Sequence, residues 1–230
     1  MKRATIICFS SFKGGAGKTT DSVATSAELG RRGFRTTLVD LDVQANATIN
    51  VSLAESAEMA MPIDIRDLSE AVSNAPKGLA AQIQRIAEAS DYVVIDTPGN
   101  MESYGTQMAL MLADIAVVPV QPLPYDLAST RKTMQVLERV QALNPKLICL
   151  VVKNRPERTV ISRNVDAMLD DLGLPVMRVV IARSVALVEM GATGHPLWKL
   201  GRGAQKANEN IRDFVDELLA RSNGAVETTA

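Results

Sequence analysis

A stretch near the start of the chain, SFKGGAGKTT at residues 11–20, has the residue types of a loop that binds phosphate. Its closely spaced glycines would let successive backbone N–H groups point at phosphate oxygens. Lys18 would reach the β- and γ-phosphates of a nucleotide, and the Thr19 hydroxyl would bind Mg²⁺. The expected nucleotide contacts in this loop are Gly14, Gly15, Ala16, Gly17, Lys18, Thr19 and Thr20.

Two features separate this loop from the standard phosphate-binding pattern. The pattern begins with a glycine at the position where this chain has Phe12. The next residue, Lys13, is a second lysine directly before the glycines, where the charge of bound phosphates would act on it. Lys13 cannot easily repeat the role of Lys18 on the same nucleotide. The loop therefore predicts a nucleotide site that uses two lysines in different ways.

Acidic residues stand at the ends of two apolar runs. Asp40 and Asp42 lie in VDLD at residues 39–42, and Asp96 ends VVID at residues 93–96. Because the carboxyl ends of parallel strands face the ligand crevice of an open α/β sheet, we expect these carboxylates beside the phosphate loop. Asp96 is expected to hold Mg²⁺, in part through water. Asp40 is expected either to contribute to the metal site or to cap the end of its strand.

Short apolar runs alternate with stretches of helical spacing along the chain. The runs are apolar over their whole length, which is typical of parallel strands covered on both faces. The strands are expected at residues 5–10, 36–42, 92–97, 115–120, 147–154 and 177–182, and the helices at 20–32, 78–90, 102–114, 127–143, 160–173 and 203–221. This order predicts a doubly wound α/β fold with a mostly parallel sheet and helices on both faces, as one domain over residues 1–221 with a polar tail at 222–230.

The composition is that of an ordinary globular protein, with 47% hydrophobic and 22% charged residues among 230. The formal net charge is −1, so any contact with nucleic acid must come from a local basic patch. Cys8 and Cys149 lie inside predicted strands, which indicates buried, reduced thiols and is compatible with the cytoplasm. No apolar run approaches the roughly 20 residues of a membrane helix, and the N-terminal run is expected to be a strand, not a signal peptide.

Three segments resemble the ParA/MinD family of ATPases. KGGAGKTT at residues 13–20 resembles the deviant Walker A box of that family, and DLDVQ at 40–44 resembles its Asp-x-Asp-Pro-Gln segment, with Val43 in place of the proline. PVQPLPYD at 119–126 resembles the PVQPSPYD of small ParA proteins. The resemblance covers nearly the whole chain and is weak at residues 50–90 and after 200. It implies a P-loop ATPase fold that binds ATP with Mg²⁺.

The resemblance also implies roles for individual residues. In that family the first lysine of the loop contacts the nucleotide of the partner subunit across a face-to-face dimer. Lys13 is therefore implied to act in dimerisation and catalysis, together with Lys18, while Asp42 is implied to orient the attacking water. Asn154 and Arg155, which end a predicted strand, are expected either to contact the adenine or to form a plain turn.

The family divides by what the ATP-bound dimer binds. Membrane binding is not expected here, because the last helix carries acidic residues and lacks a basic, apolar ending. Non-specific DNA binding, which is the favoured interpretation, would require exposed basic residues; the alternative is that these residues form a solvated helix start. The expected DNA contacts are Arg163, Arg183, Lys199, Arg202 and Lys206.

The resemblance implies a weak ATPase that dimerises with ATP, is stimulated by a ParB-like or other partner protein, and positions plasmid DNA, chromosomal DNA or another cargo. Its expected location is the cytoplasm, in association with the nucleoid. Two alternatives stay open on the sequence. The protein could be a nucleotide-gated recruitment scaffold with little turnover, for example in conjugative DNA transfer, or a small-molecule ligase on the same scaffold. An iron–sulfur reductase is disfavoured, because Cys8 and Cys149 lie within strands.

Overall fold

The computed structural model describes the chain apart from residues 1–2, 75, 122–125, 156–168, 170–174 and 228–230. Its strands form one all-parallel sheet in the order β3-β2-β4-β1-β5-β6, so the predicted doubly wound α/β architecture is confirmed. The strands are β1 (Thr5–Phe9), β2 (Thr36–Asp40), β3 (Asp64–Asp67), β4 (Tyr92–Asp96), β5 (Ile115–Val120) and β6 (Ile148–Lys153).

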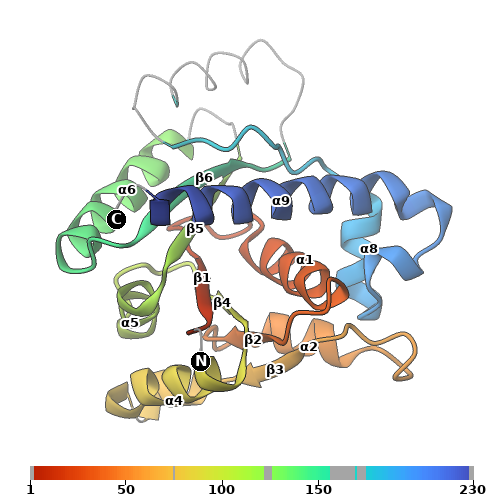
Figure 1. Ribbon diagram of the computed structural model, residues 1–230, viewed down its shortest axis with the longest axis horizontal. Coiled ribbons are helices and arrows are strands. Elements are labelled where there is room, and N and C mark those ends of the chain that lie inside the picture. Colours follow the sequence, from red (N-terminus) through yellow and green to blue (C-terminus); the bar gives the residue numbers. More distant parts are fainter. Residues whose placement is uncertain (1–2, 75, 122–125, 156–168, 170–174, 228–230) are drawn as a thin grey trace.

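Helices cover both faces of this sheet (Figure 1). The α-helices are α1 (Lys18–Arg31), α2 (Asn46–Ser52), α3 (Ser69–Asn74), α4 (Pro76–Ala89), α5 (Tyr104–Leu112), α6 (Asp126–Leu143), α8 (Val185–Thr193) and α9 (Gln205–Glu227). Two 3-10 turns, η1 (Leu197–Lys199) and η2 (Arg202–Ala204), connect α8 to α9. Among the described residues, no helix is both long enough and apolar enough to cross a membrane.

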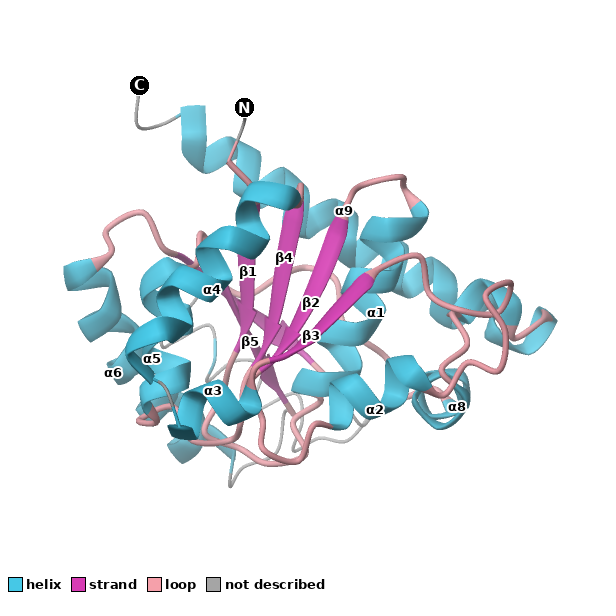
Figure 2. Ribbon diagram, turned by 90° about the horizontal axis from the view of Figure 1, so that it is seen from below, coloured by secondary structure: helices cyan, strands magenta, loops and turns pink. Residues whose placement is uncertain are grey.

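Alternation along the strands explains why helices are needed on both sides. In β1, Ile6 and Cys8 pack into one core with α4, α5 and α6, while Ile7 and Phe9 pack into a second core with α1, α8 and α9. Figure 2 shows these two groups of helices on opposite sides of the strands. A strand that is buried on both faces cannot alternate apolar with polar residues, which accounts for the uniformly apolar runs in the sequence.

The pairing register brings the predicted site residues to one edge of the sheet. Asp40 of β2 lies opposite Asp96 of β4, and Asp96 lies opposite Phe9 of β1. The three strands therefore end at the same level. The loop that follows β1 starts next to both carboxylates, and this places the phosphate loop and the acidic residues together.

Two predictions on strands were wrong. Residues 177–182 do not form a strand; only isolated bridges join Val176 to Val151 of β6 and Ile181 to Asn154 directly after β6. The backbone N–H groups of Arg178 and Val179 donate instead to the carboxylate of Glu217 in α9, so a side chain replaces the strand ladder. The second error is an omission, because β3 has the polar sequence DIRD and carries no apolar run.

The helix predictions differ from the structure in smaller ways. Helix α9 continues to Glu227, beyond the predicted end near Arg221. The helix predicted at residues 160–173 falls almost entirely outside the described residues. Cys8 and Cys149 are buried and unpaired, as expected from their places in β1 and β6.

Candidate functional site

The loop between β1 and α1 borders a cavity of about 520 Å³ at the carboxyl ends of the central strands. Gly15 and Gly17 have φ angles of 74° and 108°, a region that favours glycine. Gly17 is also the N-cap of α1, so the positive end of the helix dipole lies at this cavity, where it favours an anion. The rest of the lining comes from residues 42–44, 46 and 98–100 and from Arg155.

Lys18 extends from the first turn of α1 and is almost completely buried. Its Nζ donates to the carbonyl oxygen of Lys13 at 3.2 Å, which holds the ammonium group against the loop. Burial lowers the pKa of Lys18, while the negative charges of Asp96 and Asp42 oppose this change. The ammonium group is therefore held in place beside two acidic side chains before any phosphate binds.

Lys13 lies on the side of the loop that faces β5. Its Nζ is 3.3 Å from Oε1 of Gln121, and Nε2 of Gln121 donates to the carbonyl oxygen of Gly15 at 3.0 Å. Gln121 thus ties the Lys13 side chain to the backbone of the phosphate loop. The sequence argument did not single out Gln121, although the residue lies in the PVQP segment that carried the family resemblance.

Asp96 and Thr19 form the metal-binding part of the site. The Thr19 hydroxyl donates to Oδ2 of Asp96 at 2.7 Å. The other oxygen, Oδ1, is buried and has no hydrogen-bond partner among the described residues. A hydroxyl and one carboxylate next to a phosphate loop suit Mg²⁺, which takes one or two carboxylates plus phosphate oxygens and water. The described residues contain no cluster of three or more His, Cys, Asp or Glu residues, and this donor set needs none.

The charge state of Asp96 depends on its burial. Desolvation raises its pKa to about 7; the hydrogen bond from Thr19 opposes this rise, and the nearby carboxylate of Asp40 adds to it. In the metal-free protein a substantial fraction of this carboxyl group is therefore protonated near neutral pH.

We predict that Asp96→Asn stabilises the metal-free protein at pH 8. The folded state binds the Asp96 proton more tightly than the unfolded chain, whose pKa is near 3.8. Ionised Asp96 therefore costs stability progressively as pH rises from about 4 to about 7, and fully above that range. The variant should gain several degrees in melting temperature at pH 8, at roughly 2–4 °C per kcal/mol, and the gain should vanish near pH 4.

Thermal unfolding followed by circular dichroism at pH 4, 6 and 8 checks this prediction. Asp64→Asn, at an exposed position in β3, is the matched control and should change little at any pH. A difference between Asp96→Asn and wild type that stays constant over this range would contradict the assigned pKa.

Asp40 and Asp42 perform different tasks although they are two residues apart. The oxygens of Asp40 accept hydrogen bonds from the backbone N–H groups of Asp42 at 3.0 Å and Thr48 at 2.9 Å. This buried carboxylate therefore fixes both ends of the loop between β2 and α2. These hydrogen bonds are those of a strand-end cap, and the contribution of Asp40 to the metal site stays a prediction. Asp42 instead lines the cavity, where its Oδ1 accepts a hydrogen bond from the N–H group of Gln44 at 3.0 Å.

Asn154 and Arg155 lie at the carboxyl end of β6, on the opposite side of the phosphate loop from Asp96. Asn154 is 1% exposed, and its Nδ2 donates to the carbonyl oxygen of Ala16 and to Oδ2 of Asp21, both at 2.8 Å. A Cβ atom at Gly17 would overlap this Nδ2 atom, which is a second reason for glycine there. Arg155 lines the cavity.

Asp21 was not identified from the sequence, since no motif marks it. It is fully buried in the first turn of α1. Burial raises the pKa of Asp21, the positive charge of Arg155 opposes the rise, and Asp96 adds to it. Asp21 is thus a buried acid that contacts Asn154 behind the phosphate loop, and only the tertiary structure reveals it.

The described basic residues proposed for DNA binding do not line the cavity and stand just before α8, in the turns after it and at the start of α9. The four that the structure describes are exposed, and none forms an ion pair or a side-chain hydrogen bond with another described residue. They are Arg183, Lys199, Arg202 and Lys206. The fifth, Arg163, lies outside the described residues.

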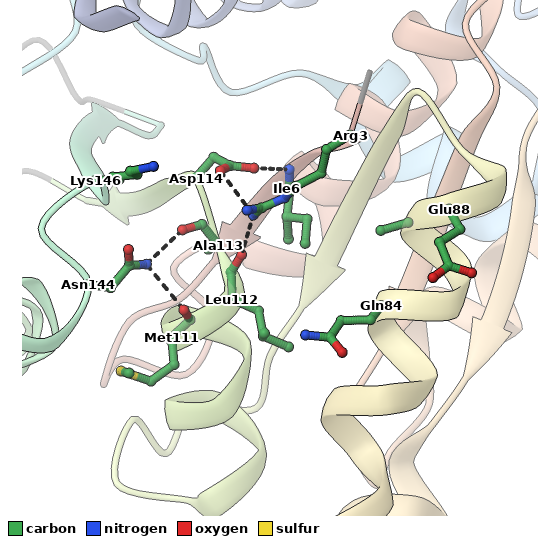
Figure 3. A pocket seen from close by; sticks show the side chains of 11 residues that line it. Arg3, Ile6, Gln84, Glu88, Met111, Leu112, Ala113, Asp114, Asn144 and Lys146 are labelled. Atoms are coloured by element: carbon green, nitrogen blue, oxygen red, sulfur yellow. Dashed lines mark hydrogen bonds and ion pairs between the residues drawn. The ribbon is translucent and has the colours of Figure 1, made fainter. Parts of the chain in front are cut away.

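A second cavity, of about 360 Å³, lies at the amino ends of β1 and β5 (Figure 3). Polar side chains that line this cavity form hydrogen bonds with other segments of the chain. Arg3 donates to Asp114 at 3.1 Å and to the carbonyl of Leu112 at 3.2 Å, and Asn144 donates to carbonyl oxygens at the end of α5. The phosphate loop and the three aspartates lie at the other end of the sheet, so we assign the nucleotide to the larger cavity.

Comparison with known proteins agrees with this geometry. A model of the CobQ/CobB/MinD/ParA nucleotide binding domain matches residues 7–197. The chain is 31% identical to the chromosome-partitioning ATPase Soj of Thermus thermophilus, covering 94% of this chain and 95% of that protein. It is 28% identical to the maintenance of carboxysome distribution protein A of Halothiobacillus neapolitanus, covering 94% and 97%. A Cyanothece McdA variant in complex with ATP superposes with a TM-score of 0.76 at 17% identity, covering 95% and 97%.

Proposed function

Because the chain belongs to the CobQ/CobB/MinD/ParA family of nucleotide-binding domains, we propose that it is a ParA-type ATPase whose ATP-bound dimer positions a cargo on DNA. ATPase activity with ATP and Mg²⁺ follows from the family, as does a part in partitioning or positioning a cargo. The observation that carries the finer proposal is the pair of lysines, Lys13 and Lys18, on one phosphate loop next to Asp42 and Asp96.

The proposed mechanism divides the work among the cavity residues. The loop N–H groups and Lys18 bind the phosphates, while Thr19 and Asp96 hold Mg²⁺, which neutralises phosphate charge when bound. Asp42 orients the attacking water at the mouth of the cavity. Phosphoryl transfer requires mainly positioning and charge neutralisation, so this small set of groups is sufficient chemistry.

In this proposal, Lys13 provides a positive charge to the nucleotide site of the partner chain. Its own side chain is half-buried and contacts Gln121 beside the phosphate loop, and it does not line the nucleotide cavity of its own chain. In the proposed dimer, Lys13 of each chain reaches the nucleotide of the other chain and adds positive charge to the transition state. This arrangement couples hydrolysis to dimerisation. A ParB-like or other partner protein that stimulates hydrolysis in the dimer would then determine when the dimer is released from DNA.

The proposal is tested as a whole by three measurements on one preparation. Light scattering should show a dimer with ATP and Mg²⁺ and a monomer without them. Plasmid DNA should be retarded at low salt only with ATP. Phosphate release should be slow without a partner. Failure to dimerise with ATP would overturn the proposal, and dimerisation without DNA retardation would remove DNA as the track on which the cargo moves.

The basic residues near α8 and α9 give a specific prediction for DNA. The double variant Arg202→Glu and Lys206→Glu should bind plasmid DNA at least about tenfold more weakly at low salt, because it replaces two phosphate contacts by repulsion. The slope of log affinity against log salt should fall by about 0.9 for each lost contact. Fluorescence anisotropy of a labelled duplex at several salt concentrations measures both quantities.

The control for this variant is Lys77→Glu, at an exposed position on α4. It changes one surface charge on the other face of the sheet and should leave DNA binding unaltered. Lys77→Glu changes the net charge by half as much as the double variant, so a loss in log affinity about half that of the double variant would mean that overall charge decides the affinity and that this patch does not. ATP hydrolysis without DNA should be unchanged in both variants.

The second candidate function, a nucleotide-gated scaffold with little turnover, shares the nucleotide site and differs in the chemistry after binding. The carboxylate of Asp42 at the cavity favours hydrolysis. The effect of its removal on turnover distinguishes the two functions.

A further inference from the structure

The second cavity, of about 360 Å³, is bordered by four segments that meet at the amino ends of β1 and β5. They are the chain that enters β1, the last turns of α4, the turn between α5 and β5, and the segment that leads into β6. Small-molecule sites in proteins have volumes of about 300–1,000 Å³, so this cavity is large enough for a small ligand. The nucleotide cavity lies at the opposite end of the sheet, so both cavities can be filled at the same time.

One wall of the second cavity is fixed by hydrogen bonds within the chain. Both carboxylate oxygens of Asp114 are used, because Oδ1 accepts from Arg3 at 3.1 Å and Oδ2 accepts from the backbone N–H group of Ile6 at 2.8 Å. Nδ2 of Asn144 donates to the carbonyl oxygen of Ala113 at 2.9 Å. These polar groups maintain the shape of the cavity, and the charge of Asp114 is already balanced by Arg3.

Two side chains of opposite charge at this cavity are not used in this way. Lys146, which precedes β6, and Glu88, in the last turn of α4, form no ion pair and no side-chain hydrogen bond with another described residue. Figure 3 shows them on opposite sides of the cavity, with Ile6 and Leu112 between them. Gln84 lies one helical turn before Glu88, on the same face of α4, and adds a side-chain amide to that side.

The surface between the two charged groups is apolar. Ile6, Ala87 and Ala113 are buried in it, and Leu112 is half-buried. A hydrocarbon chain placed over these side chains would remove apolar area from water, which is favourable. A ligand that matches the cavity therefore has an apolar middle, an anionic end for Lys146 and a cationic end for Glu88.

We propose that this cavity is a second ligand site, which binds a small zwitterion whose carboxylate and ammonium groups are separated by an apolar chain. Lys146 binds the carboxylate. The carboxylate of Glu88 and the amide oxygen of Gln84 accept hydrogen bonds from the ammonium group. The apolar chain of the ligand covers Ile6 and Leu112. This site is separate from the proposed nucleotide site and binds its ligand without a nucleotide.

Unbranched amino acids with the amino group at the far end of the chain are the first probes. Aminobutanoate, aminohexanoate and aminooctanoate of this kind are titrated into the isotope-labelled whole chain without nucleotide, and hexanoate and hexylamine serve as probes with one charged end. NMR chemical shifts should change mainly at residues that line the cavity, such as Ala87 and Asp114. At least one amino acid should bind about two- to fivefold more tightly than hexanoate and hexylamine, the range for one exposed ion pair. Equal affinities, or shift changes elsewhere in the chain, overturn the inference.

Variants of the two charged residues provide the second test. Lys146→Ala should bind the best amino acid no more tightly than it binds hexylamine, and Glu88→Ala no more tightly than it binds hexanoate. Lys132→Ala and Glu138→Ala, at exposed positions of α6, remove the same kinds of side chain outside the cavity and should leave the affinities unchanged.

Reversal of the charges separates recognition of the ligand from a role in the fold. Lys146→Glu alone should weaken binding of the amino acid, because both sides of the cavity are then acidic. Lys146→Glu combined with Glu88→Lys should restore binding, because the ligand can bind in the opposite direction. A double variant that binds as weakly as Lys146→Glu overturns the assigned roles of the two residues.

The outcomes are independent of the proposed function. Selective binding of an amino acid by a protein that does not dimerise with ATP would support the second site and overturn the proposed function. Dimerisation with ATP, without selective binding of any of the amino acids, would overturn the second site alone. A blocked tripeptide, acetyl-Glu-Leu-Lys-amide, that binds when no amino acid does would assign the cavity to a segment of a partner protein and overturn the small-molecule class.

Discussion

Asp42→Ala should lower the rate of ATP hydrolysis by about 10²–10⁴-fold and leave ATP affinity within about threefold of wild type. The carboxylate lines the cavity and accepts its hydrogen bond from the N–H group of Gln44, outside the phosphate loop, so its loss should affect the attacking water more than nucleotide binding. The segment between β2 and α2 should also keep its shape, because the carboxylate of Asp40 accepts hydrogen bonds from the backbone N–H groups of Asp42 and Thr48 and is unchanged in this variant. Single-turnover phosphate release and binding of a fluorescent ATP analogue measure the two effects.

The result for Asp42→Ala also decides between the two candidate functions. In an ATPase the variant should accumulate as an ATP-bound dimer, because hydrolysis no longer ends the bound state. Asp64→Ala, at an exposed position in β3, controls for the loss of an acidic side chain near the β2 edge of the sheet and should hydrolyse ATP normally. Equal rates in wild type and Asp42→Ala would remove the catalytic role and favour the scaffold.

Lys13→Ala should abolish ATP-dependent dimerisation and reduce hydrolysis by about 10³-fold or more, the range for a cation supplied to the transition state by a partner. Binding of ATP to the monomer should weaken much less, because Lys18 and the loop N–H groups remain. Light scattering with and without ATP measures dimerisation. Lys146→Ala, at the second cavity on the opposite end of the sheet, removes a lysine of the same kind and should have no effect.

A mixing experiment tests whether Lys13 acts across the dimer. Lys13→Ala has an intact Asp42, and Asp42→Ala has an intact Lys13. In a mixed dimer, the nucleotide on the Lys13→Ala chain would receive the lysine of its partner and regain a complete site. Mixing the two inactive variants should therefore restore hydrolysis in part. If Lys13 acts only on the nucleotide of its own chain, the mixture stays inactive.

The order of the elements and most of the phosphate site could be predicted from the sequence, because the signals are local. The strands β1, β4 and β5 are short apolar runs, and the phosphate loop lies between one of them and a helix. Glycines, lysine and threonine at this spacing can be recognised without knowing what lies nearby in space. The same holds for Asp96, since the end of a buried strand is visible as the end of an apolar run.

Elements that depend on a distant partner were missed or misjudged. The run at residues 177–182 has the composition of a strand, but Glu217, far away in the chain, accepts its backbone N–H groups. Conversely, β3 is polar and would not be a strand without the edge of β2 to pair with.

The sequence by itself determined that this protein has a parallel α/β sheet with a two-lysine phosphate loop and carboxylates at the strand ends. Only the tertiary structure decided that Asp40 clasps a loop, that Gln121 holds Lys13, and that Asp21 contacts Asn154. The physical reason is that residue type and spacing encode backbone geometry and burial along one segment. A hydrogen bond between segments that are more than 100 residues apart, as for Asp21 and Asn154, depends on the packing of the whole domain.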